Sequence, residues 1–282
     1  MYLPLYVIYA FMISLGSGVL GAMLGMGGGT IMVPLLIFLL KVPIHVASGA
    51  SIIAVVATSS AAAVSYVREE MTNMRLGMFL ELATTIGAVT GAFLISVMTE
   101  SALRTVFGIS LLYAASTMFL QSRRMERSWA QRPNDAIADR LHLEGSYFDS
   151  ARNESITYGV SNTPITFIIS YVAGIVSGLL GIGGGGIKVP AMNAVGGIPM
   201  KVAVATSNFM IGVTAAASAL VYIRHGYCDA FLTAPVVLGT LAGALIGARL
   251  IRHVRGVDLK KVFVVVLLVL GLRMILSGVG VW

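Results

Sequence analysis

The sequence Gly25-Met26-Gly27-Gly28-Gly29-Thr30-Ile31-Met32-Val33-Pro34 is present in this chain in two closely similar copies. The second copy, Gly181-Ile182-Gly183-Gly184-Gly185-Gly186-Ile187-Lys188-Val189-Pro190, begins 156 residues after the first. Both copies lie inside long apolar segments, where a run of glycines is unfavourable because glycine breaks a helix interior. A glycine break repeated in both halves of an apolar chain is typical of a binding site near the middle of a membrane.

The composition indicates that lipid, rather than water, surrounds most of the chain. Of its 282 residues, 57% are hydrophobic and only 11% are charged, and the mean hydropathy is +0.90. A soluble domain has about 25% charged residues, and apolar runs of about 18 residues or more are typical of membrane helices. We therefore predict an all-α polytopic protein that spans a lipid bilayer.

The charge and cysteine content exclude several other classes of protein. The net charge is +7, but the basic residues lie in short segments between apolar runs, where the positive-inside rule explains them without a nucleic-acid partner. Cys228 is the only cysteine, so an internal disulfide or a cysteine metal site is excluded. The first residues lack the basic region of a cleaved signal peptide, so we expect the first apolar segment to be a retained helix.

The hydropathy pattern divides the chain into two apolar halves and a hydrophilic connection. We predict an N-terminal transmembrane repeat over residues 1–121, a connecting loop over 122–157 and a C-terminal transmembrane repeat over 158–282. Apolar segments cover 5–24, 30–40, 46–67, 76–98 and 102–121 in the first half, and 160–180, 187–196, 202–223, 232–250 and 262–280 in the second. Within the loop, residues 141–148 and 156–158 form a candidate β-hairpin.

The two halves match at a constant offset of 156 residues over roughly ninety positions without a gap. Matched pairs include Pro43 with Pro199, Ser51 with Ser207, Thr58 with Thr214, Tyr66 with Tyr222 and Arg68 with Arg224. Chance alignment of apolar segments would not keep prolines and arginines in register, so the chain is an internal duplication. Gly87, Gly91, Gly243 and Gly247 have the small-xxx-small spacing of closely packed helices.

The distribution of basic residues favours inverted repeats. If each half crosses the membrane five times, 14 of the 19 Lys and Arg residues share one face. These are Arg68, Arg75, Arg123, Arg124, Arg127, Arg132, Arg140, Arg152, Lys201, Arg249, Arg252, Arg255, Lys260 and Lys261. Four crossings per half, which would make the repeats parallel, leave almost no bias. We expect both termini outside and the connecting loop in the cytoplasm.

The glycine runs predict a site for a small anionic substrate. A glycine turn that opens a short helix leaves its first N–H groups unpaired, and these groups, with the helix dipole, bind anions. Pro34 and Pro190 are expected to keep these helices short. The predicted substrate-binding residues are Gly27, Gly28, Gly29, Thr30, Ser48, Ser51, Gly183, Gly184, Gly185, Gly186, Lys188, Thr206, Ser207 and Asn208. Among them, hydroxyl and amide groups can bind oxyanions without the desolvation penalty of a full charge.

Two charged residues lie within the apolar segments. Lys188, three residues after the second glycine run, is a candidate counter-charge for the anion or a gate; alternatively it snorkels or pairs elsewhere. Its counterpart in the first half is Met32, so the duplication does not require the charge. Glu81 is a candidate proton-linked group, although we favour an interfacial position for it.

A glycine run, a proline and a His/Lys-x-Ala-x-x-x-Ser element are all present twice in the chain. The element is His45-Val46-Ala47-Ser48-Gly49-Ala50-Ser51 in one half and Lys201-Val202-Ala203-Val204-Ala205-Thr206-Ser207 in the other. Through these motifs the chain resembles the sulfite exporter TauE/SafE family of membrane permeases. The resemblance covers essentially the whole chain and implies outward transport of sulfite, sulfoacetate or related anions across the bacterial inner membrane. The first copy has Ala50 where the second has Thr206, which implies one fewer hydroxyl donor in the first.

We therefore expect a secondary transporter of the inner (plasma) membrane that exports a small sulfur-containing anion by alternating access. The alternative is an ion-coupled importer of another small solute, such as an amino acid or a metal cation, because broken helices also present carbonyl ends that bind cations. The glycine runs lack the Gly-Lys-Ser/Thr signature of nucleotide sites, and we expect no cofactor and no metal. The chain has no zinc-protease motif or nucleophile elbow, so we do not expect an enzyme. No feature indicates an oligomeric state.

Overall fold

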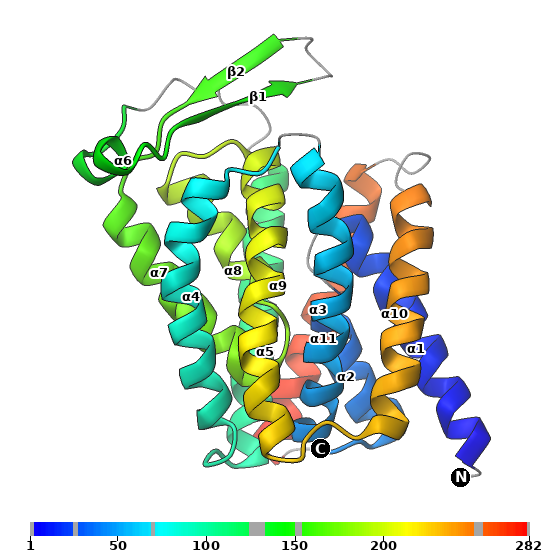
Figure 1. Ribbon diagram of the computed structural model, residues 1–282. Helices are drawn as coiled ribbons and strands as arrows, with labels where there is room; N and C mark the ends of the chain where they lie inside the picture. The colour runs from blue at the N-terminus through cyan, green and yellow to red at the C-terminus, as the bar shows by residue number, and fades with distance from the viewer. Residues whose placement is uncertain are drawn as a thin grey trace.

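A computed structural model of the chain describes residues 3–24, 28–68, 71–123, 133–149, 154–250 and 256–280. It is a bundle of helices with a small two-stranded sheet at one end (Figure 1). The first half contains α1 (Leu3–Leu24), α2 (Gly29–Leu40), α3 (Ile44–Arg68), α4 (Met74–Leu94) and α5 (Glu100–Arg123). The second contains α7 (Thr163–Leu180), α8 (Gly185–Pro190), the π-helix η1 (Ala191–Val195), α9 (Met200–Arg224), α10 (Ala230–Leu250) and α11 (Gly256–Gly278). Between them lie α6 (Ala136–Leu141), β1 (Gly145–Asp149) and β2 (Glu154–Tyr158).

The helix bounds follow the duplication. At the offset of 156 residues, α3 matches α9 and α4 matches α10 at both ends, and α2 matches α8 together with η1. Pro34 lies inside α2 and does not end it, but α2 is short, with 12 residues from Gly29 to Leu40. Pro190 ends α8, and the chain continues as a π-helix.

Corresponding helices of the two halves run in opposite directions. A Cβ on Gly49 of α3 would meet Tyr227, just after α9, whereas a Cβ on Gly212 of α9 would meet Ser59 of α3, so α3 and α9 are antiparallel. Contacts of Gly108 with Gly271, and of Gly278 with Ser101, show the same relation between α5 and α11. This is the relation expected between inverted repeats, and Figure 1 shows it along the whole bundle.

Glycines bring helices of different halves into close contact. A Cβ on Gly87 of α4 would lie 2.2 Å from the Tyr171 carbonyl oxygen of α7, and one on Gly91 would lie 2.1 Å from that of Ile175. Gly243 and Gly247 of α10 make the equivalent approach to α1. The packing role predicted from the small-xxx-small spacing is confirmed.

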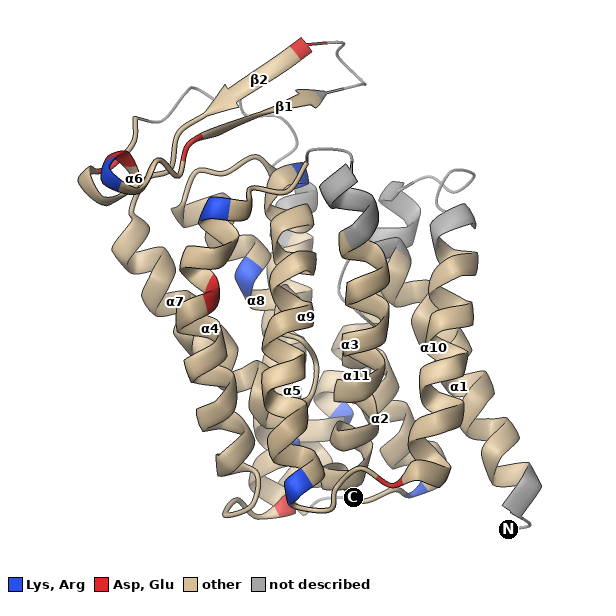
Figure 2. Cartoon of the chain, in the orientation of Figure 1, with Lys and Arg blue, Asp and Glu red and all other residues tan. Residues whose placement is uncertain are grey.

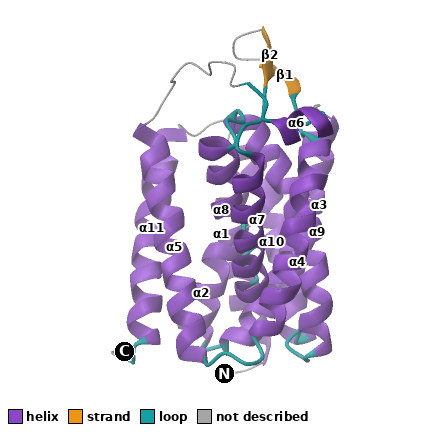
Figure 3. Ribbon diagram, turned by 90° about the vertical axis from the view of Figure 1, so that its left-hand side faces the viewer, coloured by secondary structure: helices purple, strands orange, loops and turns teal. Residues whose placement is uncertain are grey.

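The predicted β-hairpin is confirmed: β1 and β2 pair antiparallel, Gly145 opposite Tyr158. The hairpin and α6 lie over one end of the bundle, which we call the hairpin end, while both termini reach the opposite end (Figure 3). Asn73, before α4, donates to the Leu143 carbonyl (2.7 Å) and to the Tyr158 hydroxyl (3.1 Å). Burial raises the pKa of Tyr158 to about 12, so this hydroxyl stays protonated at neutral pH.

The exterior of the bundle is apolar. Large side chains such as Leu82, Leu220, Phe231, Leu238 and Leu245 are more than 60% exposed. Among the described residues, seven helices are long and apolar enough to cross a membrane, and α2 and the part of α11 from Phe263 to Gly278 are shorter apolar helices. The chain is thus an all-α multi-pass membrane protein, as predicted.

Figure 2 shows how few charges lie along the middle of the bundle. Of the 14 basic residues predicted to share a face, Arg75 donates to the His142 carbonyl at the hairpin end, and Lys201 begins α9 there. Six others, Arg124, Arg127, Arg132, Arg152, Arg252 and Arg255, lie outside the described residues. At the opposite end, Arg104 forms a salt bridge of 3.0 Å with Glu100.

Candidate transport site

Each glycine run opens a short helix inside the bundle. Gly28 and Gly184 are the N-caps of α2 and α8, with φ of 74° and 71°, and Gly183 has φ of 80°. These left-handed conformations strongly favour glycine. The Gly28 carbonyl accepts from the Met32 N–H, and the Gly184 carbonyl accepts from the Lys188 N–H. Gly27 lies outside the described residues.

The first N–H groups of both helices lack a backbone partner among the described residues. Within the part of the chain that the structure describes, Gly29, Thr30, Gly185 and Gly186 donate no backbone hydrogen bond. Gly29 also has a packing role, because a Cβ there would lie 2.7 Å from Ser51 Oγ and 3.1 Å from the Gly181 carbonyl oxygen. The start of α2 therefore abuts the glycine turn of the other half.

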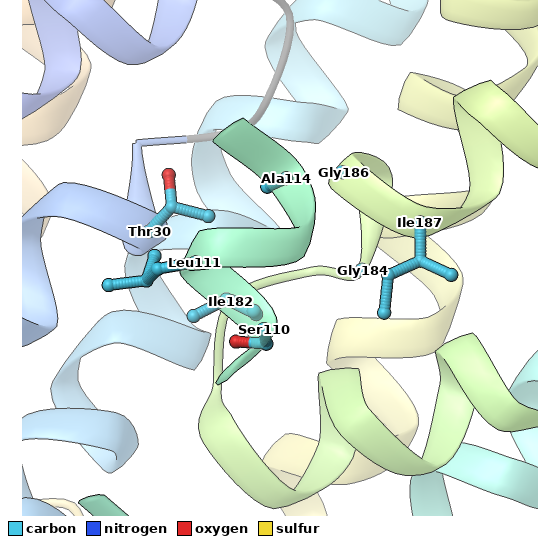
Figure 4. Close-up of a pocket in the computed structure, with 8 residues that line it drawn as sticks. All are labelled: Thr30, Ser110, Leu111, Ala114, Ile182, Gly184, Gly186 and Ile187. Carbon is cyan, nitrogen blue, oxygen red and sulfur yellow. The ribbon is translucent and has the colours of Figure 1, made fainter. Parts of the chain in front are cut away.

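A small cavity lies between the two helix starts (Figure 4). Thr30 of α2 lines one side, the turn and first residues of α8 line another, and α5 closes it. The lining residues are Thr30, Ser110, Leu111, Ala114, Ile182, Gly184, Gly186 and Ile187. Its volume is about 10 Å³, roughly the space of one water molecule. Both helix starts thus face one enclosed space, which is closed to a larger ligand in this conformation.

The hydroxyl groups near the glycine runs and in α9 differ in how they are used, and of those described here only Thr30 lines the cavity. Thr30 is 3% exposed and its Oγ1 has no hydrogen-bond partner, as is also true of Ser207 Oγ. Ser51 Oγ instead donates to the Gly181 carbonyl at 2.7 Å. The Ser177 hydroxyl, which the sequence analysis did not single out, is buried without a partner, and its Cβ would lie 3.0 Å from a Cβ on Gly184. Unpartnered buried hydroxyls are uncommon and unfavourable, so they indicate groups that a ligand can satisfy.

The remaining predicted polar residues are buried at the starts of α3 and α9. Ser48 and Thr206 are 0% exposed and Asn208 is 5% exposed. Thr206 Oγ1 accepts from the Asn73 N–H (3.1 Å), so this hydroxyl connects α9 to the segment before α4. None of these three residues lines the cavity. The sequence pattern grouped them with the glycines, but the structure does not place them at the cavity wall.

Lys188 belongs to a buried polar network beside the cavity. Its side chain is 0% exposed, and Nζ donates to Thr214 Oγ1 at 2.9 Å. Thr214 Oγ1 donates in turn to Glu81 Oε1 at 2.7 Å. In this conformation the Lys188 ammonium is thus paired with Glu81 through Thr214 instead of facing the cavity.

Glu81 is 7% exposed, so it is not the surface carboxylate that the interfacial interpretation requires. Besides Thr214, Thr85 donates to its Oε1 and Thr84 to its Oε2, each at 2.8 Å. The signal for this arrangement is in the sequence, because Thr84 and Thr85 follow Glu81 by three and four residues and share its helix face. Thr214, from α9, could not be found that way.

An apolar exterior around a buried polar centre, where two helices begin between other helices, is the architecture of a membrane transporter. Within the described residues, no group of three or more His, Cys, Asp and Glu side chains could hold a metal ion. The arrangement offers instead amide and hydroxyl donors together with a buried ammonium.

Comparison with known proteins gives the family. The family model of the sulfite exporter TauE/SafE matches residues 10–274, and the chain belongs to this family of membrane transporters. It is 26% identical to the probable membrane transporter protein YunE of Bacillus subtilis over 270 residues, which cover 93% of this chain and 95% of that protein. It is 26% identical to the probable membrane transporter protein MJ0441 of Methanocaldococcus jannaschii, covering 84% of this chain and 80% of that protein. No solved structure matches the chain.

Another relative contains this fold as part of a longer chain. The probable membrane transporter protein MamO of Paramagnetospirillum magneticum is 24% identical over 282 residues, which cover 94% of this chain but 44% of that protein. The names of these relatives describe membrane transporters and not enzymes.

Proposed function

We propose that this transporter exports a small sulfur-containing anion, sulfite or an organosulfonate such as sulfoacetate, by alternating access between its two halves. The observation that carries the proposal is that residues at the starts of α2 and α8 line one shared cavity. Amide donors at a helix start favour an anion, and the unpartnered Thr30 hydroxyl adds a donor that an oxyanion can satisfy. The family description supplies the class of substrate.

The size of the cavity implies a closed conformation. A volume of about 10 Å³ holds a water molecule but not sulfite, so the substrate must enter when the two helix starts separate. The helices α2 and α8 belong to halves that run in opposite directions through the bundle. Rocking one half against the other would therefore open the cavity first to one side of the membrane and then to the other.

We further propose that the protein lies in the bacterial inner membrane with the hairpin end in the cytoplasm and both termini outside. In this orientation Arg75, Arg140 and Lys201 lie on the cytoplasmic side, as the positive-inside rule requires. An outside-positive membrane potential then favours the exit of an anion.

Flux into proteoliposomes tests the proposal. Labelled sulfite, sulfoacetate and sulfate are offered with and without a pH gradient, and we expect saturable flux of at least one of the two proposed substrates. An ion-coupled importer is the second candidate, which the buried Glu81 favours because carboxylates bind protons and cations. Flux of labelled amino acids or metal cations, without flux of sulfur anions, would support that candidate and contradict ours.

A further inference from the structure

The charged network joins the two halves, with Glu81 on α4 and Lys188 and Thr214 on α8 and α9, and the symmetry-related position carries no charge. At the offset of 156 residues, Lys188 corresponds to Met32 and Glu81 to Val237, so both charges are absent from the other copy. Two of the three threonines are kept: Thr214 corresponds to Thr58 and Thr84 to Thr240, whereas Thr85 corresponds to Leu241. At the symmetry-related position, Thr240 Oγ1 of α10 donates to Met32 Sδ of α2 at 3.5 Å. Packing of the repeat therefore does not require Lys188 or Glu81.

Lys188 is the only oppositely charged group that faces Glu81 among the described residues. On α4, Arg75 is six residues away and donates to the His142 carbonyl. The neighbouring helix α7 has Tyr171 as its only titratable residue, and α8 has only Lys188. On α9 the titratable groups are Lys201, Tyr222 and Arg224, all at least eight residues, or about 12 Å along the helix axis, from Thr214.

The Lys188 side chain runs beside the wall of the cavity. A Cβ on Gly184 would lie 3.4 Å from Lys188 Cε, and Gly184 itself lines the cavity. Side chains in a helix lean toward its N-terminus, which here is the end that faces the cavity. Lysine has a flexible four-carbon stem, so rotation of this side chain can carry the ammonium from Thr214 to an anion in the cavity.

The surroundings of Glu81 suit both protonation states of the carboxyl group. Its two oxygens accept three hydrogen bonds, from Thr84, Thr85 and Thr214, which stabilise the ionised form. A hydroxyl can also accept, so the same threonines can receive the proton of a neutral carboxyl group. A buried carboxylate that loses its counter-charge is strongly destabilised unless it takes up a proton.

We propose that Glu81 is the proton site that couples anion binding to proton uptake. The Lys188 ammonium is paired with Glu81 in the empty site and with the anion in the occupied site. In the empty carrier, the Lys188 ammonium is paired with the Glu81 carboxylate through Thr214. When an anion binds, the ammonium moves to the anion, and Glu81 takes one proton from solution, so that one positive charge enters the site with each anion. A dianion such as sulfoacetate then crosses together with a proton and carries one net negative charge. This inference rests on the proposed function, since it requires a sulfur anion in the cavity.

Anion binding to the purified full-length transporter tests this coupling. Sulfoacetate is the probe, because its own charge is constant from about pH 6 to about pH 8.5. A pH-indicator dye in weakly buffered solution measures proton uptake, and titrations at several pH values measure affinity. We expect about one proton taken up per sulfoacetate bound, and affinity that falls about tenfold for each unit of rising pH.

Variants assign the proton to Glu81. In Glu81→Gln we expect sulfoacetate to bind with less than a twofold change in affinity over the same pH range and without proton uptake. Thr240→Val, which removes the equivalent hydroxyl from the uncharged copy, should keep the wild-type proton uptake. If Glu81→Gln does not yield folded protein, Thr214→Val serves instead and should reduce the pH dependence, since it breaks the connection between the two charges.

The outcomes distinguish this inference from the function on which it rests. Sulfoacetate binding without proton uptake in the wild type, or uptake that persists in Glu81→Gln, overturns the coupling but leaves anion transport in place. A wild-type protein that binds neither sulfoacetate nor sulfite overturns the proposed function and the coupling together.

Discussion

Ser51 of the first half donates a 2.7 Å hydrogen bond to the carbonyl of Gly181 in the second half, 130 residues away. The bond joins the start of α3 to the glycine turn that precedes α8, on one side of the proposed anion site. Its counterpart Ser207 is equally buried but has no partner. The duplicated serines are therefore used differently in this conformation.

We predict opposite effects of alanine at these two serines. Ser51→Ala leaves the buried Gly181 carbonyl without its partner, which should cost about 1–3 kcal/mol of stability. Ser207→Ala removes a hydroxyl that bonds to nothing, so stability should hold within about 0.5 kcal/mol. Thermal unfolding of the two purified variants makes the comparison, and equal losses of stability would contradict it.

The pairing of Lys188 with Glu81 predicts non-additive effects on stability. Either Glu81→Gln or Lys188→Met alone disrupts a buried pair and should cost about 3–5 kcal/mol. The double variant removes both charges, and we expect it to lose clearly less than the sum of the single losses. A double-mutant cycle by thermal unfolding checks this. Strict additivity would mean that the two residues are not coupled.

Because the Thr30 hydroxyl has no partner, we predict that its removal weakens sulfite binding without changing stability. Thr30→Val keeps the shape of the side chain and removes an unpartnered donor from the cavity wall. Sulfite affinity should fall by a factor of about 10–100, since a hydrogen bond to a charged group contributes about 1.5–3 kcal/mol, as measured by equilibrium binding. Thr233→Val, which removes another unpartnered hydroxyl on α10, is the matched control and should bind like the wild type.

The Asp135 carboxylate caps α6 and accepts from the Thr163 N–H of α7, so we predict that the stability of α6 depends on pH. Burial tends to raise the pKa of this carboxyl group, but N–H donors of Ala138, Thr163 and Ile137 and the Thr163 side chain hold it below its ordinary value. A lowered pKa means that the stabilisation is present above the ordinary pKa, near 4, and is lost as the pH falls through the lower folded value. The protection factors of the α6 amides, which are corrected for the pH dependence of intrinsic exchange, should therefore fall in that acidic range.

Asp135→Ala should accelerate exchange of α6 already at neutral pH, because it removes an N-cap that contributes about 1 kcal/mol. Asp139→Ala, an exposed acid on the same helix, is the control and should change exchange little. If both variants exchange alike, the cap is not what holds α6.

Much of the fold could be predicted because the two halves of the chain match in sequence at a constant offset. Pro43 and Pro199 match at the same offset as the starts of α3 and α9, and the hairpin follows from its apolar and turn residues. The site was only partly predictable. Helical spacing puts Thr84 and Thr85 beside Glu81, but Thr214 comes from another helix 130 residues further on, and no local pattern connects them. For the same reason Thr206 was grouped with the site, although its hydroxyl accepts from Asn73.

The most direct measurement is sulfite and sulfoacetate flux into proteoliposomes that contain wild type, Gly184→Leu or Gly226→Leu. Gly184 and Gly226 share a positive φ, of 71° and 72°, so leucine strains both backbones alike. Gly184 lines the cavity, and a Cβ on it would lie 3.0 Å from Ser177 Cβ and 3.1 Å from the Ala173 carbonyl oxygen of α7, whereas one on Gly226 meets no atom within 4 Å. With equal insertion, we expect flux in the wild type and Gly226→Leu and none in Gly184→Leu. Flux through Gly184→Leu at the wild-type rate would contradict a transport site between the two helix starts.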